Sequence, residues 1–172
     1  MNVSQMKSEE QDSLISIHHT ILPKRKKGFE KKNMAYFGTS NSEHGIEEPI
    51  LSMVKRVLDS ANKTDYDLSK WFVEFQQRNC GFEKKVKRTF DWHRDDYAAV
   101  GFKVYTVIFY LRKDKTIKGG NLEYEIDNEK YIQEIESGDI LCFDGDLIHR
   151  PEICSGMGCR DSIVVFVKRT GK

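Results

Sequence analysis

The sequence lacks several features that would place it in a specialised class. Its 28 Lys and Arg residues are balanced by 27 Asp and Glu residues, so its overall charge does not favour nucleic acid or a membrane as a partner. No apolar run approaches the roughly 18 residues that a membrane-spanning helix needs. Residues 1–12 are polar and contain no apolar stretch of the kind found in secretion signals. These absences predict a cytoplasmic protein that does not associate with membranes.

The cysteines are few, and their spacing is uninformative. The four cysteines show no C-x-x-C pair, and they are Cys80, Cys142, Cys154 and Cys159. Without a secretion signal the default expectation is free thiols. A metal role for Cys154 and Cys159 has little support, because thiolates would bind zinc tightly and block oxygen chemistry.

The 172 residues suit one domain, which we expect over residues 14–172. Residues 1–13 are predicted to be disordered because they are polar and have little apolar surface to bury. Loose apolar alternation predicts an edge strand from Leu14 to Leu22. Helical spacing of apolar residues predicts a helix over Glu47–Ala61, and alternation predicts a strand over Lys70–Arg78. Further short strands separated by turns predict a mainly β fold with flanking helices and a jelly-roll core at about residues 70–169.

Two histidines and one aspartate stand out as candidate metal ligands. His93 and Asp95 are two residues apart and would share one face of a strand, and His149 follows 56 residues later. Two imidazoles and one carboxylate form the facial ligand set of non-haem Fe(II) sites, which leaves coordination positions open. Asp96 competes with Asp95 for the carboxylate role, but strand alternation would turn it to the opposite face. The sequence therefore favours His93, Asp95 and His149 as both the catalytic and the metal-binding residues.

Arg160 opens the last apolar strand, where a buried guanidinium would be costly without an anionic partner. The segments around these residues follow a recognisable order: an apolar run at 104–111, Gly119-Gly120, a second run at 137–143, His149, and the run that begins at Arg160. This order resembles the Fe(II)- and 2-oxoglutarate-dependent oxygenases, particularly their prolyl-hydroxylase-like branch. The resemblance covers about residues 70–169.

The resemblance implies a double-stranded β-helix (a jelly-roll, cupin-like core), with Fe(II) as cofactor, 2-oxoglutarate and O2 as co-substrates, and ascorbate as a further candidate. It implies that Arg160 anchors the far carboxylate of 2-oxoglutarate and that Tyr110 hydrogen-bonds to it. Other residues implied at the co-substrate pocket are Ser162, Thr106, Leu122 and Phe166. It also places Trp92, Arg94 and Arg150 near a substrate entrance.

The activity that this resemblance favours is hydroxylation of a C–H bond in a peptide or protein residue, with release of succinate and CO2. A basic cluster from Lys24 to Lys32 keeps a second hypothesis open, a hydroxylase or demethylase of nucleic acid. A third hypothesis is a non-enzymatic jelly-roll binding module. A small-molecule substrate also stays open.

Overall fold

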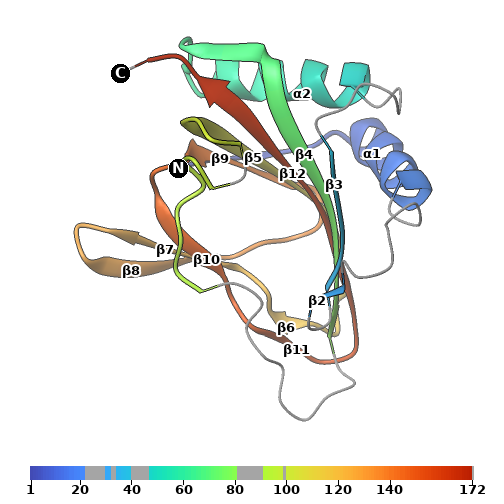
Figure 1. The fold of residues 1–172 in the computed structure, drawn as a ribbon. Coiled ribbons are helices and arrows are strands. Elements are labelled where there is room, and N and C mark those ends of the chain that lie inside the picture. Colours follow the sequence, from blue (N-terminus) through green and yellow to red (C-terminus); the bar gives the residue numbers. More distant parts are fainter. Residues whose placement is uncertain (22–29, 32–33, 40–46, 81–90, 99, 172) are drawn as a thin grey trace.

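A computed structural model describes residues 1–21, 30–31, 34–39, 47–80, 91–98 and 100–171. These residues form antiparallel sheets flanked by two helices (Figure 1). The sequence prediction of a mainly β fold with flanking helices is confirmed. No helix of the described residues is both long enough and apolar enough to cross a membrane.

The strands form one large sheet and two small ones. The large sheet has the order β1 (Asn2–Gln5), β9 (Asp139–Asp144), β5 (Val104–Lys113), β12 (Gly158–Arg169), β4 (Tyr66–Cys80), β3 (Met34–Thr39) and β2 (Glu30–Lys31). The second sheet has the order β10 (Ile148–Pro151), β7 (Leu122–Ile126) and β8 (Glu129–Gln133). The third consists of β11 (Cys154–Ser155) and β6 (Lys118–Gly119), and the helices are α1 (Ser8–Ile21) and α2 (Glu47–Ser60).

Strands β5 and β12, in the middle of the large sheet, are buried on both faces, which explains why they read as continuous apolar runs. Along β5, Val107 and Phe109 belong to the core that both helices help to form, whereas Ile108 and Tyr110 belong to a second core on the opposite face. Successive side chains point to opposite faces of a strand. Strands β4, β5 and β12 therefore pack against the helices with one face, and their other face contributes to the second core.

The first 13 residues, for which the sequence predicted disorder, contain β1 and the start of α1. Residues 2–5 pair with β9, and the backbone N–H of Met6 donates to the carbonyl of Gly138 at 2.8 Å. The edge strand predicted from Leu14 is wrong, because the described part of that segment belongs to α1. Leu14, His18 and Ile21 are buried at helical spacing. Local sequence did not predict β1, because its pairing partner, β9, lies more than 130 residues away in the chain.

Two other predictions are confirmed. The helix expected over Glu47–Ala61 is α2, and the strand expected over Lys70–Arg78 is the middle of β4. Asp127 and Asn128 form the two-residue turn between β7 and β8 with φ of 53° and 66°. Positive φ at both positions matches the twist of a hairpin.

The expectation of free thiols is confirmed for Cys142 and Cys159. It is wrong for Cys154, which is disulfide-bonded.

Candidate metal and co-substrate site

Two distant segments bring the histidines together. His93 and His149 form an isolated antiparallel bridge in which each backbone N–H donates to the other residue's carbonyl at 3.0 Å. The chain then turns, and the backbone N–H of Asp95 donates to the carbonyl of Gly145 at 2.8 Å. The 56-residue separation is therefore closed by backbone hydrogen bonds on both sides of the site.

Both imidazoles are oriented by backbone carbonyls. Nδ1 of His93 lies 2.7 Å from the carbonyl oxygen of Asp91, and Nδ1 of His149 lies 3.0 Å from that of Leu147. A carbonyl can only accept, so each Nδ1 carries the proton and each Nε2 keeps a lone pair. Hydrogen bonds of this kind fix the tautomer of metal-binding histidines in proteins.

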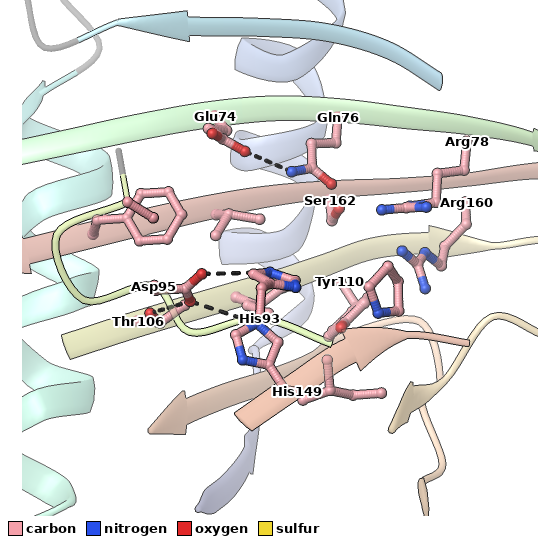
Figure 2. A pocket seen from close by; sticks show the side chains of 16 residues that line it. Glu74, Gln76, Arg78, His93, Asp95, Thr106, Tyr110, His149, Arg160 and Ser162 are labelled. Atoms are coloured by element: carbon pink, nitrogen blue, oxygen red, sulfur yellow. Dashed lines mark hydrogen bonds and ion pairs between the residues drawn. The ribbon is translucent and has the colours of Figure 1, made fainter. Parts of the chain in front are cut away.

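The two Nε2 atoms face the Asp95 carboxylate (Figure 2). One carboxylate oxygen lies 3.6 Å from Nε2 of His93, and the other lies 3.5 Å from Nε2 of His149. One donor atom from each residue lies within 4.8 Å of the others. An ion about 2 Å from each donor would fit such a group. Burial lowers the pKa of His149 and so favours the neutral imidazole that a metal requires.

Asp95 and Asp96 have different surroundings. The Thr106 hydroxyl donates to Asp95 at 2.7 Å and fixes the buried carboxylate from the side of β5. The Asp96 carboxylate instead accepts the backbone N–H of Val104 at 2.8 Å. The strand argument that favoured Asp95 does not describe this segment, because His93 forms only a bridge and a turn follows it. Local turn geometry separates the two carboxylates.

A cavity of about 200 Å³ adjoins the three candidate ligands. All six positions that the sequence analysis assigned to a co-substrate pocket line it: Thr106, Tyr110, Leu122, Arg160, Ser162 and Phe166. The strand register explains why, because directly opposed residues of antiparallel strands share a face. Tyr110 is opposite Ser162, and Thr106 is opposite Phe166.

Arg160 closes the cavity at the end away from the histidines (Figure 2). It is 3% exposed, its guanidinium carbon lies 5.3 Å from the centre of the Tyr110 ring, and one of its nitrogens donates to the carbonyl of Gly120. Its Nε is buried with no hydrogen-bond partner among the described residues. Burial lowers the pKa of Arg160, since the charged form loses hydration. A buried cation with an unused donor suits an anionic ligand.

The sequence analysis missed the polar side chains that β4 contributes to the cavity. Glu74, Gln76 and Arg78 are opposite Val164, Ser162 and Arg160 in the register of β12, and all of these residues line the cavity. Burial and the neighbouring Arg160 lower the pKa of Arg78 to about 9, so it is still protonated at neutral pH. One sequence pattern could have identified these residues. From Glu74 to Arg78 every second residue of β4 is polar, although the strand lies inside the sheet.

Several predicted contacts lie elsewhere. The basic cluster from Lys24 to Lys32 falls outside the described residues, apart from the backbone of Lys31 in β2. Trp92 and Arg150 contact each other, with the guanidinium carbon 4.2 Å from the centre of the indole ring, and Arg150 also pairs with Glu123. Arg94 is exposed. None of these three lines the cavity.

No protein-family model and no curated protein sequence matches this chain. Solved structures do match in fold. A Pseudomonas putida prolyl-4-hydroxylase matches with a TM-score of 0.65 at 13% identity, covering 98% of this chain and 93% of that one. A Trichoplax adhaerens prolyl hydroxylase, in complex with a hypoxia inducible factor peptide fragment, matches with a TM-score of 0.66 at 12% identity, covering 98% and 83%.

The viral collagen prolyl hydroxylase of Paramecium Bursaria Chlorella virus-1, in complex with 2-oxoglutarate, matches with a TM-score of 0.60 at 17% identity, covering 99% and 96%. An oxidoreductase of the 2-oxoglutarate–Fe(II) oxygenase family from Burkholderia pseudomallei matches with a TM-score of 0.62 at 12% identity, covering 96% and 81%. The predicted double-stranded β-helix is thereby confirmed, and the chain has the fold of the 2-oxoglutarate–Fe(II) oxygenases, including prolyl hydroxylases.

Proposed function

We propose that this protein is an Fe(II)- and 2-oxoglutarate-dependent dioxygenase. On this proposal it hydroxylates a C–H bond of a peptide or protein residue and releases succinate and CO2. The observation that carries the proposal is one cavity with two complementary ends. One end has three ligand atoms within 4.8 Å of one another, and the other has a buried guanidinium with an unused donor.

The donor set fits Fe(II). Two neutral imidazoles and one carboxylate suit this ion, and no cysteine lines the cavity within the described part of the chain. His93, Asp95 and His149 would hold the ion, and Thr106 would keep the Asp95 carboxylate in position. Bound iron would supply the redox chemistry that couples oxidation of the co-substrate to hydroxylation of the substrate.

The other residues of the cavity would bind and orient the co-substrate. Arg160 would hold the far carboxylate of 2-oxoglutarate, with the hydroxyls of Tyr110 and Ser162 beside it. Arg78, opposite Arg160 in the strand register, adds a second positive charge at this end. Ile108, Leu122, Val164 and Phe166 give the cavity apolar walls that exclude water from the reaction.

The test has two stages. Binding of Mn(II), and then of 2-oxoglutarate to the Mn(II)-loaded protein, is measured by calorimetry on the wild type and on Asp95→Asn. Succinate formation is then measured with Fe(II), O2 and a panel of peptides, oligonucleotides and no substrate. The proposal expects Mn(II) binding that Asp95→Asn weakens, and succinate formation that a peptide stimulates.

Mn(II) binding that Asp95→Asn leaves unchanged would contradict the assigned site. Metal and 2-oxoglutarate binding without succinate formation under any condition would favour a non-enzymatic binding module. Stimulation by oligonucleotides alone would favour the nucleic-acid hypothesis.

A further inference from the structure

The hairpin of β7 and β8 extends the site-bearing face of its sheet away from the cavity. His149 in β10 is opposite Tyr124 in β7, and Tyr124 is opposite Tyr131 in β8. Directly opposed residues share a face, so both tyrosines lie on the face that carries the His149 imidazole. Leu122 precedes Tyr124 by two residues and lines the cavity. A continuous strip therefore runs from the candidate metal site onto the hairpin, which projects from the body of the molecule (Figure 1).

We name the outer part of this strip the hairpin platform: Tyr124, Tyr131, Ile126 and Glu129. The two tyrosine rings are stacked, with centres 5.4 Å apart and planes inclined by 21°. Tyr131 is 40% exposed, and its hydroxyl donates to the Glu129 carboxylate at 2.7 Å. Ile126 is opposite Glu129 and is 44% exposed. The platform thus presents aromatic surface beside a carboxylate that a neighbour holds in place.

The hairpin is strongly acidic although the whole chain is nearly neutral. Residues 122–136 contain six carboxylates and one cation, against a net charge of +1 for all 172 residues. Arg150 pairs with Glu123, and the one cation, Lys130, is opposite Glu125 and lies over the Trp92 ring. Lys130 is adjacent to Tyr131 in its strand and therefore points away from the platform. Four exposed carboxylates remain in this segment: Asp127, Glu129, Glu134 and Glu136.

We propose that the hairpin platform docks a lysine- or arginine-rich peptide segment and so directs the neighbouring residue of that peptide into the cavity. This inference rests on the proposed oxygenase function and specifies its substrate class. Exposed tyrosine rings attract ammonium and guanidinium groups through their faces. Carboxylates form charge-assisted hydrogen bonds with the same groups. A nucleic-acid backbone would meet repulsion here, because its affinity depends on cations that neutralise phosphate.

The test measures binding of short fluorescein-labelled peptides to the full-length Mn(II)- and 2-oxoglutarate-loaded protein by anisotropy. The peptides share length and a Gly/Pro background, and alternate positions carry lysine, serine or glutamate. The lysine peptide should bind most tightly, and its affinity should fall as salt is raised, since screening weakens attraction between exposed charges. Single-stranded DNA and RNA of similar length serve as competing probes.

Two variants locate the contact. Glu129→Lys should weaken binding of the lysine peptide by about fivefold or more, because an attraction becomes a repulsion. Tyr131→Ala should weaken it by a smaller factor. Asp59→Lys is the matched control, because Asp59 is an exposed carboxylate that also accepts a tyrosine hydroxyl, that of Tyr66 at 2.6 Å, but lies in α2. Asp59→Lys should leave the affinity for the lysine peptide within about twofold of the wild-type value. Thermal melting checks that each variant folds.

The inference is overturned if the lysine peptide binds no better than the serine peptide, if Glu129→Lys binds it like the wild type, or if an oligonucleotide binds more tightly. These failures are distinct from failure of the proposed function. Retained Mn(II) and 2-oxoglutarate binding without a peptide preference removes only the docking proposal. A peptide preference in a protein that does not bind Mn(II) removes only the oxygenase proposal.

Discussion

Two clusters in this chain contain the same side chains, two histidines and an aspartate, yet differ in their hydrogen bonding. His93, Asp95 and His149 surround one end of the cavity, and His18 and His19 in α1 lie beside Asp161 in β12. In the first cluster both histidines use Nδ1 on backbone carbonyls and turn Nε2 toward the carboxylate. In the second, His18 Nε2 lies 2.9 Å from the carbonyl of Gln76 and donates its proton to it.

The two aspartates differ even more. Asp161 accepts a hydrogen bond from Gln77 at 3.0 Å, and an Arg112 nitrogen lies 3.3 Å from its other oxygen. Among the described residues, no Lys or Arg lies within salt-bridge distance of Asp95. A guanidinium satisfies the charge that a metal would otherwise neutralise. We therefore expect that the partners of each ligand, more than the residue types, decide which cluster binds an ion.

The largest expected effect is on metal binding. His149→Ala should abolish detectable Mn(II) binding at concentrations that saturate the wild type, and with it succinate formation, because one of three ligands is lost. His18→Ala is the matched control in the other cluster and should keep one Mn(II) per chain. Electron paramagnetic resonance of free Mn(II) measures both. Two ions per chain in the wild type, falling to one in His18→Ala, would show that both clusters bind Mn(II) and would contradict the expected difference between them.

The next largest effect is expected on binding of the co-substrate. Each hydrogen bond to a charged group contributes about 1.5–3 kcal/mol, so Arg160→Met should raise the KM for 2-oxoglutarate by about tenfold or more. Arg112→Met removes an arginine from the other cluster and should leave this KM within about twofold, because it lies on the helix side of the sheet. Initial rates of succinate formation at varied 2-oxoglutarate concentrations give the KM of each variant. An equal rise in both variants would show that the effect reflects general destabilisation.

An effect of similar size, on metal affinity, is expected for the residue that positions Asp95. Thr106→Val keeps the shape of the side chain and removes the hydroxyl that donates to the carboxylate. Loss of such a partner typically weakens metal affinity by about 10- to 100-fold. Thr106→Ser retains a hydroxyl and should restore most of the affinity, as titration with Mn(II) would show. If Val and Ser behave alike, the hydrogen bond does not position the ligand.

The smallest effect is on stability. His18→Ala leaves the Gln76 carbonyl without its buried partner and opens a cavity under α1. An unsatisfied buried group costs about 1–3 kcal/mol, so the free energy of unfolding in urea should fall by about that amount. His19→Ala, at a largely exposed position, should change it by less than about 0.5 kcal/mol. Equal losses for the two would indicate that His18 has no special packing role.

Elements whose signals are local could be predicted from the sequence alone. Strands β5 and β12 were predictable because burial on both faces requires continuous apolar runs. The amphipathic spacing in α2 was equally clear. The candidate site could be predicted because few residue types bind Fe(II), and because a buried arginine is costly without an anionic partner.

Other features depend on partners that are distant in sequence and come together only in the folded protein. Residues 2–5 form a strand because β9 offers an edge, and residues 8–21 form a helix because the large sheet covers its apolar face. Arg78 reaches the cavity through its register with Arg160, and Thr106 reaches Asp95 across eleven residues. The same holds for the two histidine clusters. His93 and His149 meet through a bridge between distant segments, and the proton of His18 Nε2 goes to the carbonyl of Gln76, 58 residues away. Composition and periodicity contain no information about those contacts.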